Sequence, residues 1–91
     1  MQEIKKKNKE VGEYFFDSAT MRFFKSEISN KTFGNYFVTS ECGPSGLRRY
    51  SVRVFDPETG RITTHGNFQE YETLREAHKF ALRASQATSR P

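Results

Sequence analysis

The segment RRYSVRVFDPETGRITTH, residues 48–65, constrains the fold more than any other part of this 91-residue chain. Apolar and polar side chains alternate along it up to the turn DPETG, which is the period-two pattern of a β-strand with one buried face. Pro57 has the fixed negative φ that suits a type I turn, and Gly60 can adopt a positive φ. The sequence therefore predicts a hairpin that bends between Val54 and Ile62.

A strand before this hairpin and a helix after it complete the predicted sheet. Alternation places Tyr36 and Val38 on one face of the earlier strand, which a loop rich in glycine and proline follows. Residues 71–87 show helical spacing, and Thr73 and Glu76 form a capping box at their start. The face of this helix expected to pack on the sheet carries Leu74, Ala77, Phe80, Ala81 and Ala84.

The rest of the chain is predicted to be less regular. Residues 1–10 hold four lysines in a polar stretch, which is typical of a flexible basic tail. A short strand is expected within residues 11–16, and a short additional helix near residues 18–27. The prediction is a single α+β domain over residues 11–87, in which a small antiparallel meander of three to four strands packs against the C-terminal helix, with residues 88–91 as a tail.

Composition limits the core and the cellular setting. Only 34% of the residues are hydrophobic, so nine phenylalanines and four tyrosines must supply much of the buried area. No apolar run approaches the roughly 20 residues that span a bilayer, and the N-terminus lacks the apolar core of a secretory signal. We expect a soluble cytoplasmic protein with no membrane partner, and the single Cys42 fits a reducing compartment.

The sequence contains no recognisable catalytic or metal-binding pattern. Cys42, His65 and His78 stand on different predicted elements, and two histidines with one cysteine at these spacings make a poor zinc set. The glutamates near the start of the C-terminal helix complement its macrodipole, and no phosphate-binding glycine motif is present. We therefore expect a protein that is not an enzyme, with no catalytic residues, no metal and no cofactor.

Strand alternation also predicts a functional face on the sheet. The side expected to face the helix carries Tyr50, Val52, Val54 and Ile62. The opposite side then combines arginines with aromatic residues, which is unlike an ordinary solvated surface of mixed charges. Thr39 and Thr63 are expected there as well. The candidate binding residues on and around this face are Arg48, Arg49, Arg53, Phe55, Arg61 and Phe37, together with Lys5, Lys6 and Lys7 of the tail.

Three interpretations of this face are open on the sequence alone. For nucleic acid, the arginines would neutralise phosphates or read guanine, while Phe37 and Phe55 would stack on bases. For a protein partner, the same residue types dominate binding energy, and an open aromatic face would also let two copies pair as a homodimer. In a structural interpretation, the N-terminal strand or the short helix covers Phe37 and Phe55.

Two resemblances bear on function. Over residues 47–87, the YSVRVF strand, the DPETG turn and the TLREA helix are similar in layout to the arm-type DNA-binding domains of phage integrases, which implies DNA in preference to RNA. Over residues 14–81, the strings TMRFF, YFVTSE and GNFQEY resemble a family of small uncharacterised proteins encoded by phages and related mobile elements. This second resemblance implies an accessory protein of the host-cell cytosol that binds nucleic acid, a nucleoprotein complex or a host defence protein.

Overall fold

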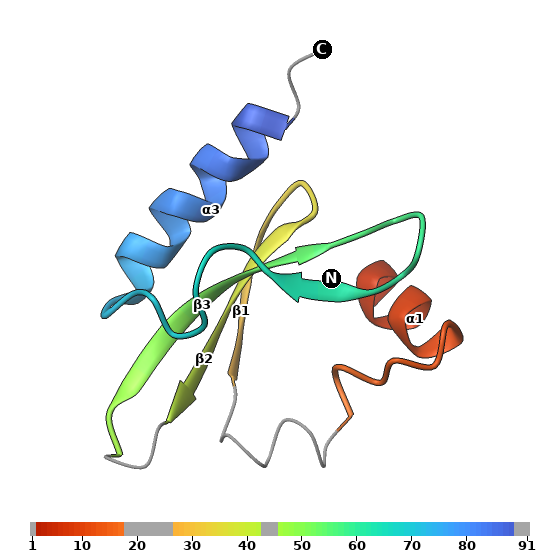
Figure 1. Ribbon diagram of the computed structural model, residues 1–91, viewed down its shortest axis with the longest axis horizontal. Helices are drawn as coiled ribbons and strands as arrows, with labels where there is room; N and C mark the ends of the chain where they lie inside the picture. Colours follow the sequence, from red (N-terminus) through yellow and green to blue (C-terminus); the bar gives the residue numbers. More distant parts are fainter. Residues whose placement is uncertain (1, 18–26, 43–45, 89–91) are drawn as a thin grey trace.

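The antiparallel sheet is the frame of the computed structural model, which describes residues 2–17, 27–42 and 46–88. Its four strands lie in the order β1-β2-β3-β4, so each strand pairs with its neighbour in the sequence (Figure 1). The elements are α1 (Gln2–Glu10), β1 (Glu27–Phe33), β2 (Tyr36–Cys42), β3 (Arg48–Phe55), β4 (Ile62–Thr64) and α3 (Leu74–Thr88). The predicted α+β meander with a C-terminal helix is confirmed. Within the described ranges, no helix is long and apolar enough to cross a membrane.

The helix α3 packs on one face of the sheet, against β2 and β3. Thr73 caps it as predicted, because the Glu76 N–H donates to Thr73 Oγ1 at 3.2 Å. Ala77 and Ala81 are fully buried, since their small side chains let the helix approach the strands closely. The core on this face consists of Tyr36, Val38, Val52, Ala77 and Ala81, with Phe33, Tyr50, Val54, Tyr71 and Ala84 packed around them.

Three apolar residues and one threonine depart from their predicted positions. Leu74 and Phe80 are 40% and 39% exposed, because only the narrow alanine stripe of α3 faces the sheet. Ile62 pairs with Phe55 across β3 and β4, and directly opposed residues share a face. Ile62 therefore lies on the side away from α3, and Thr63, which pairs with Val54, lies on the side of α3; the sequence assigned both to the other face.

The face opposite α3 carries a second core, to which the N-terminal helix and the segment after it contribute. Residues 1–10 were expected to be a flexible tail, but α1 occupies this stretch from Gln2 and buries Ile4 and Asn8. These two residues are four positions apart and so lie on one side of the helix. The second core consists of Ile4, Phe37, Phe55 and Ile62, with Phe15, Phe16 and Ile28 packed against them.

Asn8 fastens α1 to the turn between β3 and β4. Its Nδ2 donates to the Gly60 carbonyl at 2.9 Å and to Glu13 Oε1 at 2.8 Å, and its Oδ1 accepts from the Phe15 N–H at 2.8 Å. Glu13 Oε1 also accepts from the Ile62 N–H at 2.9 Å. The buried amide is thus satisfied on both its oxygen and its nitrogen, as burial of a polar group requires.

The segment between α1 and β1 differs from its prediction. Residues 11–16 form turns and irregular backbone in place of the expected strand, because Gly12 and Tyr14 have φ angles of 81° and 56° and cannot be extended. The predicted short helix falls on residues 18–26, which lie outside the described residues. Glu27, the last residue of that prediction, begins β1.

Gly60 makes the contact between the turn and α1 sensitive to one methyl group. At its φ of +75°, a Cβ would lie 2.8 Å from Val11 Cγ1 and 3.1 Å from the Lys7 carbonyl oxygen. We expect Gly60→Ala to lower the free energy of unfolding by about 2 kcal/mol or more, measured by chemical denaturation. Gly12→Ala is the matched control, since Gly12 has a φ of +81° with nothing within 4 Å and should lose only about 1 kcal/mol. Equal losses would contradict the close contact.

Candidate functional site

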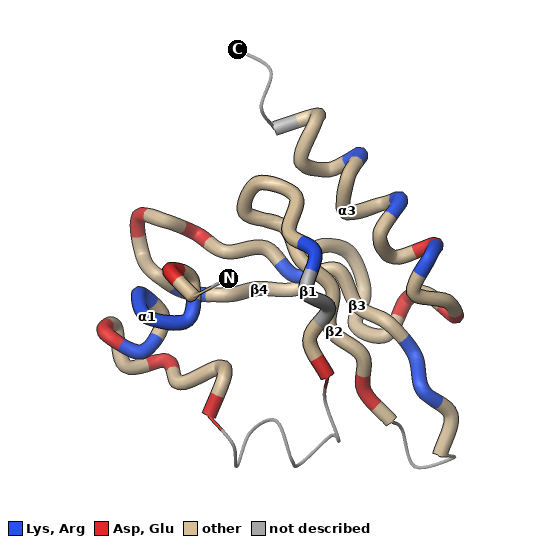
Figure 2. The backbone as a smooth tube through the Cα atoms, turned by 180° about the vertical axis from the view of Figure 1, so that it is seen from behind, with Lys and Arg blue, Asp and Glu red and all other residues tan. Residues whose placement is uncertain are grey.

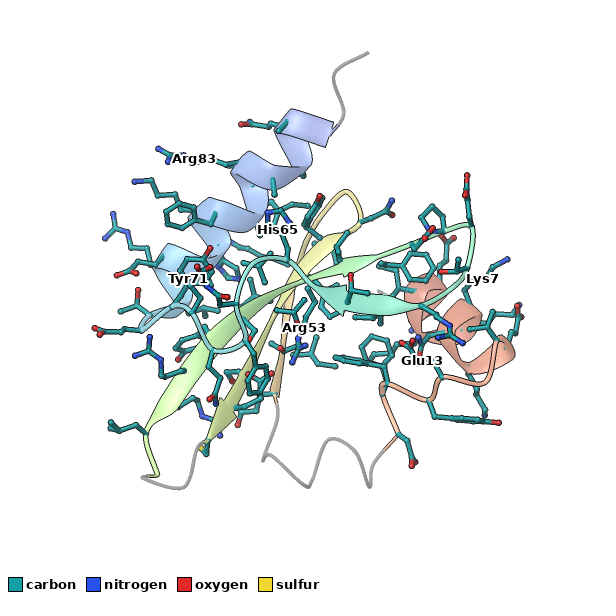
Figure 3. All side chains as sticks on the ribbon, in the orientation of Figure 1. Lys7, Glu13, Arg53, His65, Tyr71 and Arg83 are labelled. Carbon is teal, nitrogen blue, oxygen red and sulfur yellow. The ribbon has the colours of Figure 1, made fainter. Side chains whose placement is uncertain are left out.

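Arg53 lies at the centre of a polar network on the sheet face opposite α3 (Figure 3). Its Nη2 forms an ion pair with Glu41 Oε1 at 2.8 Å, and its Nε donates to Thr39 Oγ1 at 3.0 Å. Its Nη1 donates to Thr64 Oγ1, so one guanidinium group joins β2, β3 and β4. Only 13% of the Arg53 side chain and 1% of the Glu41 side chain are exposed. Arg53 therefore serves the fold and offers little surface to a partner.

The Glu41 carboxylate is also held by two hydroxyl groups. Thr39 Oγ1 donates to its Oε1 at 2.7 Å, and Ser51 Oγ donates to its Oε2 at 3.3 Å. Gln69 closes the network, because its N–H donates to Ser51 Oγ at 2.7 Å and its Nε2 donates to the Glu41 carbonyl at 3.1 Å. A buried ion pair persists only when its remaining hydrogen-bonding positions are filled in this way.

Two phenylalanine rings enclose the Arg53 guanidinium. The Arg53 Cζ lies 5.3 Å from the centroid of Phe15 and 5.2 Å from the centroid of Phe68, within the range of cation–π interactions. Phe15 belongs to the segment after α1, and Phe68 belongs to the connection between β4 and α3. One arginine thus holds two irregular segments against the sheet.

Phe37 and Phe55, the predicted stacking residues, are buried. Phe37 is 0% exposed and Phe55 is 7% exposed, and the Phe37 ring contacts the rings of Phe15 and Phe16 at centroid distances of 6.4 and 5.9 Å. The structural interpretation of this face is the one observed, although α1 and its following segment provide the cover. The open aromatic face expected to pair two copies of the chain is covered in the same way.

Arg49 and Arg48 also bond within the molecule, at the start of β3. Arg49 Nε donates to the Gln69 carbonyl at 2.7 Å, and its Nη1 lies 3.6 Å from a carboxylate oxygen of Glu72. Arg48 Nη1 donates to Ser40 Oγ at 2.7 Å. Both side chains are half-buried. Three of the four predicted arginines therefore organise neighbouring segments of the chain.

Lysines are concentrated on α1, where Figure 2 shows a group of basic residues, and each lysine of this helix is exposed. Arg61, the fourth predicted arginine, is exposed as well and follows Gly60, whose carbonyl is bonded to α1. Within the described residues, no acid forms an ion pair with these side chains. We define the α1 basic surface as Lys5, Lys6, Lys7, Lys9 and Arg61.

A groove of about 400 Å³ lies beside the α1 basic surface, lined by Lys5, Asn8, Lys9, Tyr14, Phe16 and Asp17. Tyr14 is 53% exposed and has a φ of 56°, a left-handed conformation that costs a bulky residue about 1 kcal/mol or more. The Phe15 N–H bond to Asn8 and the Asp17 N–H bond to the Tyr14 carbonyl, at 2.8 and 3.0 Å, hold that conformation. A strained backbone that presents an exposed ring beside lysines marks a candidate binding site.

A second exposed basic surface lies on α3, at the other end of the molecule (Figure 3). On this surface the Arg83 guanidinium lies 5.6 Å from the centroid of Phe80, which stacks on Tyr71 with centroids 5.0 Å apart. Burial, together with the hydrogen bond and the charge of Glu70, raises the pKa of Tyr71 to about 12. The Tyr71 hydroxyl therefore stays protonated at neutral pH. The basic residues of this surface, four positions apart, are Arg75, Lys79 and Arg83.

The cysteine and the histidines occupy separate elements. Cys42 ends β2 and has a free thiol, His65 follows β4, and His78 lies on α3. The ring of His65 packs edge-on against Tyr36 at 5.3 Å, and that of His78 packs against Phe33 at 5.8 Å. In the part of the chain that the structure describes, no three histidine, cysteine or acidic side chains form a metal-binding cluster.

Sequence reasoning missed Glu41, Asn8 and Tyr14. Glu41 stands two residues after Thr39 on the predicted arginine face, and its cross-strand partner is Arg49. Extending the strand alternation by two residues would have placed this acid among the arginines. For Asn8 the sequence gives only a weak indication of burial, namely its position four residues after Ile4 on one side of a possible helix. Tyr14 has none, because hydrogen bonds of the folded chain hold its positive φ.

The fold and these surfaces define a small α+β domain with a basic helix on each side of one sheet. The chain matches the model of the family of unknown function DUF7447 over residues 1–82, and it belongs to that family. The matched range includes α1 and the whole sheet. No curated protein and no solved structure matches the chain. An uncharacterised family was expected, whereas the likeness to integrase arm domains stays a prediction.

Removal of Arg53 is expected to leave Glu41 as an unpaired buried carboxylate. Arg53→Met should lower the free energy of unfolding by about 3 kcal/mol, measured by urea denaturation. Adding Glu41→Leu should recover at least half of that loss, because the double variant no longer buries a lone charge. Arg49→Met is the control and should cost clearly less than Arg53→Met, since the Glu72 carboxylate of its ion pair is 77% exposed and is not left buried. Equal losses for the two single variants would contradict the central place of Arg53.

His78 is expected to make stability depend on pH. Burial lowers its pKa from the ordinary value of 6.5, and the nearby charge of Lys31 lowers it further. The unfolded chain therefore binds the proton more readily, so the contribution of His78 is full above about pH 6.5 and is lost as pH falls through the lower folded-state pKa. Between about pH 7.5 and 5.5, the Tm of the wild type should fall more than that of His78→Gln. Parallel Tm curves would contradict this assignment.

Proposed function

We propose that this protein binds nucleic acid, or a complex that handles nucleic acid, through the α1 basic surface. It acts by binding and not by catalysis, as an accessory protein of a phage or related mobile element in the host-cell cytosol, and uses no cofactor. DNA is preferred over RNA in this proposal because residues 47–87 resemble the arm-type domains of phage integrases.

The observation that carries the proposal is a row of exposed lysines on one anchored helix. Each lysine of α1 is exposed, and within the described residues none is neutralised by an ion pair. Such side chains gain affinity for a phosphate backbone by releasing its condensed counterions. Buried Ile4 and Asn8 hold the helix in place, so binding does not have to order a free tail.

The proposed surface differs from the predicted sheet face, because the fold uses most of that face internally. Arg53 bonds to buried Glu41, and Phe37 and Phe55 lie in the second core. The predicted site residues that the structure leaves exposed are Lys5, Lys6, Lys7 and Arg61. Lys9 joins them as a residue that the sequence analysis did not select.

Contact with a host protein alone is the second candidate, and one observation on α3 favours it. Arg83, Phe80 and Tyr71 form a continuous stack at the surface, and Phe80 is 39% exposed. Arginine and aromatic residues contribute most binding energy at protein interfaces. In this alternative, the protein inhibits a host defence system by a protein–protein contact through α3.

Replacing lysines of α1 should weaken nucleic-acid binding more than an equal loss of charge on α3. The α1 triple variant is Lys6→Gln/Lys7→Gln/Lys9→Gln, and the matched α3 triple variant is Arg75→Gln/Lys79→Gln/Arg83→Gln. We expect the α1 triple variant to bind labelled DNA at least about tenfold more weakly than the wild type at about 50 mM salt, measured by fluorescence anisotropy. The affinity of the α3 triple variant should differ from that of the wild type by less than about threefold.

A salt series adds a second readout. About four phosphate contacts predict a log–log slope of affinity against salt of roughly −3 on single strands to roughly −4 on duplex DNA for the wild type, and the slope of the α1 triple variant should be shallower. No binding of DNA or RNA at low salt would refute the proposal. Loss of binding in the α3 triple variant alone would move the contact to α3 and contradict the assignment to α1.

A further inference from the structure

The groove between α1 and residues 14–17 combines the kinds of group that recognise a nucleotide. Tyr14 contributes an aromatic ring that is 53% exposed, and Lys5 and Lys9 contribute ammonium groups. Asp17 contributes an exposed carboxylate. The volume of about 400 Å³ falls within the roughly 300–1,000 Å³ of small-ligand sites. A ring, two cations and a hydrogen-bond acceptor are therefore close together.

The lining of this groove is built onto the second core. The Phe16 ring is half-buried and packs against the rings of Phe15 and Phe37 at centroid distances of 5.0 and 5.9 Å. Lys5 Nζ lies 5.7 Å from the Phe16 centroid, which positions that ammonium by a cation–π contact. Asn8, 1% exposed, fixes the backbone of α1 behind the groove. The groove thus has a preformed floor.

The form of nucleic acid follows from the exposed ring. A base stacks on Tyr14 only when one of its faces is free, and in a duplex every base is covered by its neighbours and paired. We infer that the groove binds one unstacked base of a single-stranded nucleic acid, with the adjoining phosphates on Lys5 and Lys9. The inference rests on the proposed function, because it assigns a single strand to the same surface.

Asp17 adds a preference between pyrimidines. A carboxylate accepts a hydrogen bond from the exocyclic amino group of cytosine, whereas thymine has a carbonyl oxygen at that position. The carboxylate would repel this oxygen. The groove should therefore bind oligo-dC more tightly than oligo-dT, two strands whose rings have the same size.

Substitutions at Tyr14 distinguish the contribution of base stacking to affinity from the contribution of the lysine charges. Asparagine tolerates a positive φ, so Tyr14→Asn removes the ring without adding backbone strain, and Tyr14→Phe keeps the ring. In fluorescence anisotropy with labelled oligo-dC, Tyr14→Asn should lose about tenfold or more in affinity, and Tyr14→Phe less than about twofold. Both variants should bind a labelled duplex as the wild type does, since the lysines are intact.

Asp17→Asn tests the base preference. An amide both donates and accepts, so this variant should bind oligo-dC and oligo-dT with affinities within about twofold of each other. Wild-type protein that binds oligo-dT as tightly as oligo-dC would overturn the preference. Competition by free deoxycytidine monophosphate as strong as that by the oligonucleotide would assign the groove to mononucleotides and overturn the single-strand inference.

The outcomes distinguish this inference from the proposed function. If the wild type binds duplex and single strands equally and Tyr14→Asn changes neither affinity, the α1 basic surface binds nucleic acid but the groove does not bind a base. If the wild type binds neither form at low salt, the proposed function itself fails. A loss confined to single strands in Tyr14→Asn supports both.

Discussion

The packing on the sheet face opposite α3 depends on the ion pair between Arg53 and Glu41. A buried ion pair adds little net stability over an apolar pair of the same shape, but each partner is costly without the other. Arg53 also holds Phe15 and Phe68 against the sheet, and Gln69 completes the hydrogen bonds around Glu41. The positions of two irregular segments thus follow from one charged pair.

Because the arginines of β3 bond within the molecule, other basic side chains make up most of its exposed positive charge. The helix α3 packs on one face of the sheet, and α1 with its following segment packs against Phe37, Phe55 and Ile62 on the other, near the turn between β3 and β4 (Figure 1). All three arginines of β3 bond within the molecule, Arg53 beneath Phe15 and Phe68, and Arg48 and Arg49 at the start of the strand. Most of the exposed basic residues in the described ranges therefore belong to the two helices, along which Figure 2 shows Lys and Arg in blue, while Arg61 and Lys31 lie outside them. Within the described residues, the exposed basic surfaces of this fold therefore lie mainly on the helices.

The local structures that could be predicted are those whose backbone conformation depends on a few neighbouring residues. Gly60 has the positive φ expected of the turn, Thr73 caps α3, and Val52 faces the helix as alternation requires. The helix α1 was missed because a nine-residue polar helix is unstable alone and forms only when it docks. Its docking residues, Ile4 and Asn8, meet partners that are remote in the sequence.

The sequence by itself determined the α+β class, the strands β2, β3 and β4, the main turn and the C-terminal helix, because alternation, helical spacing and capping act over short distances. It did not predict β1, and it placed a strand at residues 11–16 where the structure has turns. Only the tertiary structure decided which charged and aromatic residues reach solvent. Asn8 bonds to Gly60 across 52 positions, and Glu13 bonds to Ile62 across 49. Burial depends on such long-range contacts, so a face of arginines and phenylalanines that looks open in the sequence becomes the interior of the fold.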